Sequence, residues 1–197
     1  SIIAVGRADC PITFESAKPS RAPGDWYGIS IYDTASSNSA FDHVIIQHAG
    51  ESDNPALLVS NEAGLAKIDN SSFELLAGNA VEFGDDATVG SFAGNTFSHV
   101  AGALVTAPAT LADDLSPVTT TDQTDPRVAI AGTTTEAATW KNLGVPYRAT
   151  RPLLITGGTV TLAAGVQLRF DPDTSIEVSD QGGLIPDGTA AEPVVFT

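Results

Sequence analysis

The chain has 197 residues, of which 42% are hydrophobic, so it is long enough for one domain with a sizeable core. Its 24 Asp and Glu residues against 9 Lys and Arg residues give a formal charge of −15, which excludes the basic surface that nucleic acid or anionic lipid requires. A single cysteine, Cys10, excludes an internal disulfide framework, and no apolar run has the length of a membrane helix, so no membrane insertion is expected.

Short strand-forming runs, separated by turn residues, follow one another along the chain. The 18 Gly and 12 Pro residues interrupt almost every stretch that could form a helix. This pattern predicts an all-β protein. The runs are residues 28–32, 43–47, 56–59, 153–155, 159–162, 166–170 and 193–196.

Two segments poor in such runs interrupt the series. A Ser/Asn-rich loop is expected at residues 34–40. Residues 108–137, rich in Thr, Asp and Pro, are predicted to form a surface excursion from a single domain that spans residues 1–197.

A 24-residue repeat lies in the first half of the chain. Residues 68–78 align with residues 92–102, so that Phe73 falls on Phe97 and Ser72 on Thr96. A repeat of this length, made of short strands and tight turns, predicts one coil of a right-handed parallel β-helix, a solenoid in which equivalent residues stack. The interior is predicted to contain Phe14, Ile45, Val59, Phe73, Val81, Phe97, Leu168 and Phe196.

A β-sandwich of hairpins is the competing fold. It is disfavoured because no Asn-Gly or Asp-Gly turn lies between two alternating strands.

The end of the chain repeats its beginning. Residues 184–197 (LIPDGTAAEPVVFT) align with residues 2–15 (IIAVGRADCPITFE) at an offset of 182. Such a chain is expected to come from a tandem array or to stack end on end, and no capping helix is evident at either end. The residues predicted to mediate self-association are Ile2, Ile3, Phe14, Trp26, Leu184, Ile185, Val194 and Phe196.

Three phrases carry a resemblance to known proteins: residues 11–32 (PITFESAKPSRAPGDWYGISIY), 139–149 (TWKNLGVPYRA) and 158–197. They resemble bacterial secreted and surface repeat proteins of the right-handed parallel β-helix, pectin-lyase-like class. The resemblance implies that fold and an extracellular or cell-surface location. It does not imply lyase activity, because one fold hosts many functions.

Polar residues give little sign of catalysis or of cofactor binding. His48 and His99 fall in one repeat column but two coils apart, about 9.6 Å, which is too far for shared metal ligation. Residues 171–175 (DPDTS) begin like a calcium loop but lack its sixth-position Gly and closing Glu, so at most a weak calcium site is expected, and turn-forming carboxylates are the alternative. No acid–base pair or carboxylate pair converges in the repeat columns, so no catalytic residue is assigned and the protein is predicted not to be an enzyme.

The sequence therefore predicts a non-catalytic structural β-helix repeat of a secreted or cell-surface assembly, with itself or neighbouring repeats as its partner, head to tail. A carbohydrate-binding or adhesive module of the same fold is the alternative, with polysaccharide as its partner and Tyr27, Tyr32 and Tyr147 as the candidate aromatic residues. A polysaccharide lyase or hydrolase is the third hypothesis.

Overall fold

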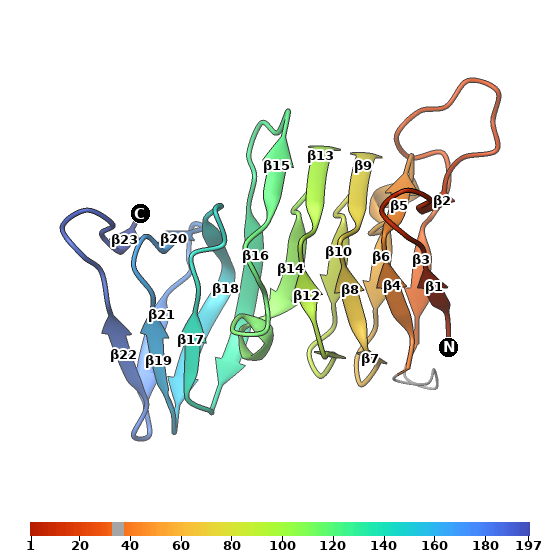
Figure 1. Cartoon of the computed structure of the whole chain (residues 1–197). Coiled ribbons are helices and arrows are strands. Elements are labelled where there is room, and N and C mark those ends of the chain that lie inside the picture. Colours follow the sequence, from red (N-terminus) through yellow and green to blue (C-terminus); the bar gives the residue numbers. More distant parts are fainter. Residues whose placement is uncertain (33–37) are drawn as a thin grey trace.

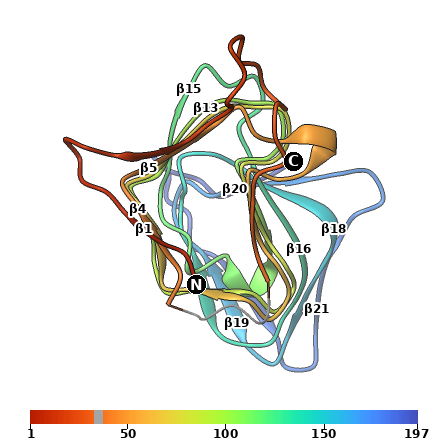
Figure 2. The same ribbon diagram turned by 90° about the vertical axis from the view of Figure 1, so that its right-hand side faces the viewer.

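The chain winds into a single parallel β-solenoid. The computed structural model describes residues 1–32 and 38–197, so the loop expected at residues 34–40 lies largely outside the described residues. Strands account for 48% and helices for 3% of the chain, and the solenoid has about seven turns (Figure 1). Seen from the N-terminal end, the chain runs clockwise as it recedes from the viewer, which is the right-handed sense (Figure 2). The predicted right-handed parallel β-helix is confirmed.

The strands form five parallel sheets that run along the solenoid axis. The first sheet contains β1 (Ile3–Val5), β4 (Ala40–Asp42), β8 (Lys67–Asp69) and β12 (Phe92–Ala93). The second contains β2 (Ile12–Phe14), β5 (Val44–Gln47), β9 (Ser72–Leu76), β13 (Thr96–Val100) and β15 (Thr119–Thr121). A two-stranded sheet contains β7 (Gly64–Leu65) and β11 (Thr88–Val89), and a three-stranded sheet contains β17 (Ala138–Trp140), β19 (Thr159–Leu162) and β22 (Gly183–Pro186).

The longest sheet connects the two ends of the molecule. It contains β3 (Ile29–Ile31), β6 (Leu57–Val59), β10 (Val81–Phe83), β14 (Val105–Pro108), β16 (Val128–Thr134), β18 (Tyr147–Thr156), β20 (Gln167–Phe170), β21 (Ile176–Ser179) and β23 (Val195–Phe196). Within the described residues the helical segments are two 3-10 turns, η1 (Glu51–Asp53) and η2 (Ala109–Leu111).

Equivalent residues of successive coils stack in register and fill the interior. Phe73 pairs with Phe97, both are at most 1% exposed, and their rings stack with centroids 5.2 Å apart at 11°. Ser72 pairs with Thr96 beside them on the outer face, where the Thr96 hydroxyl donates to Ser72 Oγ at 3.1 Å. Both predicted ladders are confirmed.

Two of the residues predicted for the interior do not lie inside it. Ile45 is half-buried, and its neighbour Ile46, which is 1% exposed, pairs with Phe73 instead. The 27-residue spacing that aligns His48 with Leu75 also aligns Ile46 with Phe73, so Ile45 was the wrong choice between two neighbouring apolar residues. Phe196 continues an inward column that includes Leu168, but it is 43% exposed, since β23 pairs with β20 and no described strand lies on its other side.

The prediction of a surface excursion at residues 108–137 is wrong. This segment supplies β15 and β16, which extend two of the sheets, and its Leu111, Leu115 and Ile130 are buried. The Thr-rich run that was taken for a loop forms β15, because β-branched residues suit a pleated strand. The solenoid therefore continues without interruption through this region.

Candidate self-association surfaces

Among the described residues, three strands of the N-terminal coil have an edge without a partner strand. Each of β1, β2 and β3 pairs with one strand only, which are β4, β5 and β6 respectively. Their other edges face away from the solenoid (Figure 1). Backbone N–H and C=O groups on such an edge are a template for pairing with a further strand.

The C-terminal coil has the same property. β22 pairs only with β19, β23 only with β20, and β21 only with β18. No helix of the described residues lies over these strands, whereas natural solenoids commonly carry a polar cap.

All the exposed large hydrophobic side chains of the described residues gather at these two ends. We call residues 1–32 the N-terminal end and residues 176–197 the C-terminal end. Long exposed apolar edges are what soluble monomers normally avoid, so their restriction to the two ends distinguishes the ends from the sides. The exposed residues are Ile3 (68%), Val5, Tyr27 and Tyr32 (60%) at one end, and Val178, Ile185 (52%) and Phe196 at the other.

The eight residues predicted for self-association divide equally between the two ends. Ile3, Ile185 and Phe196 are exposed, whereas the other five partly cover the core: Ile2, Phe14, Trp26, Leu184 and Val194. Trp26 is held against the second coil, where its indole Nε1 donates to the carbonyl oxygen of Gln47 at 2.9 Å. Sequence reasoning missed Val5, Tyr27, Tyr32 and Val178, because all the selected residues except Trp26 were chosen for their similarity between the two copies of the end phrase.

The two copies of the end phrase share a local structure. In the turn Arg7–Cys10 the amide of the first residue donates to the carbonyl oxygen of the last at 3.1 Å. In the turn Thr189–Glu192 the equivalent bond measures 3.0 Å. The glycine that precedes each turn packs closely against the backbone that follows the turn: a Cβ on Gly6 would lie 3.0 Å from the nitrogen of Ile12, and a Cβ on Gly188 would lie 2.6 Å from the nitrogen of Val194. The sequence repeat is thus also a repeat of conformation.

After this turn the two copies separate. β2 joins the five-stranded sheet beside β5, whereas β23 joins the longest sheet beside β20. The reason is that the five-stranded sheet ends at β15, so no strand of it remains for β23 to join. The structural match therefore covers the first strand and the turn.

The ends differ in charge. The N-terminal end contains three basic and three acidic residues, and they pair with one another: Arg7 with Asp9 at 3.2 Å, Lys18 with Asp25 at 2.8 Å and Arg21 with Glu15 at 2.7 Å. The hydrogen bond from Lys18 holds the pKa of Asp25 well below its usual range. The C-terminal end contains four acidic residues and no Lys or Arg: Glu177, Asp180, Asp187 and Glu192.

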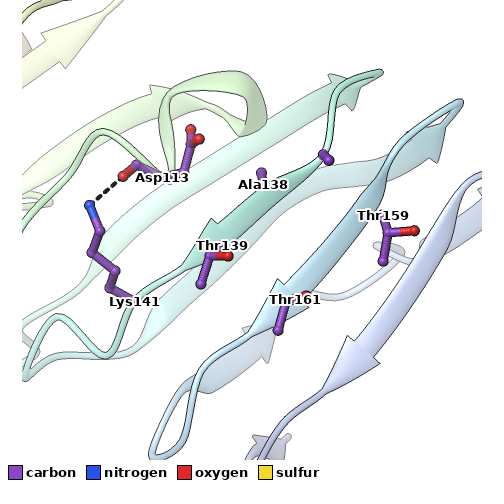
Figure 3. Close-up of a pocket in the computed structure, with 7 residues that line it drawn as sticks. Asp113, Ala138, Thr139, Lys141, Thr159 and Thr161 are labelled. Carbon is purple, nitrogen blue, oxygen red and sulfur yellow. Dashed lines mark hydrogen bonds between the residues drawn. The ribbon is translucent and has the colours of Figure 1, made fainter.

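A hollow of about 520 Å³ lies on the outside of the three-stranded sheet, near the C-terminal end. Figure 3 shows Thr139 and Thr161 side by side on β17 and β19, with Thr159 on the same sheet. Lys141 reaches the backbone oxygen of Asp113 at 2.5 Å rather than its carboxylate (Figure 3). The one ammonium group in the hollow is thus bound to the main chain, and no acid–base pair is assembled there.

The polar residues considered for metal binding either form hydrogen bonds within the protein or lie far from one another. In the part of the chain that the structure describes, no three His, Cys, Asp or Glu side chains are grouped as metal ligands. Asp171 accepts hydrogen bonds from Arg148 through its carboxylate and from Thr174 through its carbonyl oxygen, as expected of a turn residue. His48 and His99 do share a column, separated by Leu75.

The three tyrosines do not form an aromatic row. Tyr147 is fully buried, and its hydroxyl donates to the carbonyl oxygen of Lys141 at 2.9 Å; burial raises the pKa of its phenol. Tyr27 and Tyr32 remain as exposed aromatic residues.

Comparison of the chain with protein-family models, with curated proteins and with solved structures finds no match. Among the described residues, no helix is long and apolar enough to cross a membrane.

Proposed function

We propose that this chain is a non-catalytic structural unit of a β-solenoid assembly, whose two ends each accept a further coil of the same kind. One observation carries the proposal: of the seven exposed large hydrophobic side chains among the described residues, five lie on strands with an open edge at the two ends, and Tyr27 and Tyr32 flank another such strand, β3. Covering such an end would satisfy the free backbone groups and bury the apolar side chains at once.

The interior supports this reading. Ile29, Tyr147 and Phe196 belong to one inward column that runs through the whole solenoid, and its central members are fully buried. At its ends Ile29 is only partly buried and Phe196 is 43% exposed. A column that stays apolar up to its last residue favours continuation by another coil over exposure to water.

The location is part of the proposal. The acidic composition and the phrases that resemble pectin-lyase-like surface repeats favour a secreted or cell-surface assembly of that type. A carbohydrate-binding or adhesive role receives less support, because of the three tyrosines only Tyr27 and Tyr32 are accessible.

Light scattering after size exclusion, together with electron microscopy, tests the proposal. We expect the particle mass to rise with protein concentration and rods to appear one solenoid wide. Ile185→Lys should weaken this association at least about tenfold, because it places a charge in the apolar edge.

Thr96→Lys is the matched control. Thr96 is exposed on β13, which has strands on both sides, so a lysine there leaves the ends unchanged and should not alter the mass. A strictly monomeric particle at high concentration would refute the proposal. Release of unsaturated product from pectate or alginate in the presence of calcium would refute its non-catalytic part.

A further inference from the structure

We propose that the C-terminal end binds the N-terminal end of a second copy of this chain, in one register. Ile3 of the incoming copy then lies on Ile185, and the turn Arg7–Cys10 lies on the turn Thr189–Glu192. The inference rests on the proposed function and adds to it the identity, polarity and register of the partner.

The register follows from how the chain stacks on itself. Within the solenoid, similar phrases lie in adjacent coils with like residues in contact: Phe73 on Phe97, Ser72 on Thr96 and Val81 on Val105. The two copies of the end phrase are as similar to each other as these coils are. The same rule, applied between molecules, aligns residues 2–12 with residues 184–194.

The two strands present matching faces at this register. Ile3 and Ile185 are both exposed and both point outward, next to inward-facing Ala4 and half-buried Leu184 respectively. Each strand is followed by a turn of the same geometry after a closely packed glycine. An incoming β1 can therefore lie on β22 without a rearrangement of either turn.

Polarity is determined by strand direction and by charge. Every strand ladder in the described solenoid is parallel, and only a head-to-tail arrangement continues parallel pairing. A contact between two C-terminal ends would bring the four acidic residues of one copy close to the four of the other, and these like charges repel each other. The N-terminal end is neutral overall, so it meets the acidic end without that repulsion.

Disulfide trapping between two single-thiol proteins tests the register. The unmodified protein has Cys10 as its one cysteine, and this residue is exposed at the end of its turn. The double variant Cys10→Ser/Glu192→Cys has its one thiol at the matching C-terminal position. Stacked strands are about 4.8 Å apart, within the roughly 4.4–6.8 Å between Cα atoms that a disulfide spans.

The two proteins, one of them carrying a mass tag, are oxidised separately and together. We expect the mixture to form a disulfide-linked heterodimer, at least about tenfold more abundant than the homodimer that either protein forms alone. A third protein, Cys10→Ser/Thr96→Cys, carries its thiol in mid-solenoid and should give no heterodimer above background.

Each other result overturns a defined part of the inference. Predominant Cys10–Cys10 dimers would indicate head-to-head contact and refute the polarity. Rods seen by microscopy, with no heterodimer in the mixture, would refute the register and leave the proposed function standing. Monomers at every concentration, without cross-links, would refute both.

Discussion

At the scale of single residues, left-handed backbone conformation marks the corners of the solenoid. His48, Leu75 and His99 stack in one column at the C-terminal end of the strands of the five-stranded sheet, and have φ values of 63°, 52° and 52°. Asp122 continues the column with a φ of 53°. A left-handed residue at this position of each coil turns the chain sharply, so the conformation is retained although it is unfavourable for histidine and leucine. The column predicted from the histidines therefore coincides with a repeated backbone conformation.

His99 offers a test of this strain, because its side chain is exposed and packing contributes little. We expect His99→Val to lower the free energy of unfolding by about 1–2 kcal/mol, since a β-branched residue is disfavoured at positive φ. His99→Asn should change it by less than about 0.5 kcal/mol, because asparagine tolerates this region. Urea unfolding of the three proteins measures both values. Equal destabilisation by both variants would show that the imidazole itself is needed.

At the scale of the elements, an ion cluster links two neighbouring strands on the outside of the first sheet. The Asp42 carboxylate on β4 accepts a hydrogen bond from Asn70 Nδ2 at 3.0 Å and forms an ion pair with Lys67 on β8 at 2.5 Å. His43 Nδ1 lies 2.8 Å from the same carboxylate. The hydrogen bond from Asn70, followed by the one from Lys67, lowers the pKa of Asp42 to about 2. The cluster thus favours the charged carboxylate in the folded state.

This lowered pKa predicts acid sensitivity. Because the carboxyl pKa is lower in the folded than in the unfolded chain, its stabilisation is complete above about pH 4 and is lost as the pH falls toward 2. Relative to Asp42→Asn, the native protein should lose about 1 kcal/mol of stability over that interval, a value reduced for solvent screening at this surface site. Chemical unfolding of both proteins between pH 2 and pH 6 measures the difference. Parallel pH curves would contradict the prediction.

The elements also show how far the sequence predicts the fold. Where two coils have the same length, as around Phe73 and Phe97, aligned phrases predict the ladder residue by residue. Where two neighbouring strand residues are both apolar, as Ile45 and Ile46 are, hydrophobicity does not distinguish the inward one, and a shift of one residue exchanges the inner and outer faces. Residues 108–137 were misassigned for a related reason: their coil contains a run of threonines and a 3-10 turn, and no similar coil precedes it for alignment.

The candidate self-association surfaces were only partly predictable. The end repeat identified Ile3 and Ile185, but exposure of Val5 and Val178 depends on which strands come last in each sheet. The sheet topology determines which strands come last, and the similarity between the two end phrases gives no information about it. The sequence likewise could not predict that β2 and β23 join different sheets, since this depends on where the five-stranded sheet ends.

At the scale of the whole molecule, the two ends are different surfaces, so their contact is heterologous. Such a contact uses one end of each copy and leaves the other free, and therefore adds subunits without closing. A contact between two identical ends would instead stop at a dimer. The two modes differ in what happens when one end of each molecule is blocked.

Variants with one end blocked distinguish the two modes of contact. Ile3→Lys blocks the N-terminal end and Ile185→Lys blocks the C-terminal end, each with a charge on an exposed strand edge. Alone, each variant should stay monomeric, because every head-to-tail pairing of its copies involves a blocked end. Mixed in equal amounts, the two should form a 1:1 dimer and nothing larger, since one free end of each kind remains. Light scattering of the variants, alone and mixed, measures this, and dimers of either variant alone would show that like ends bind each other.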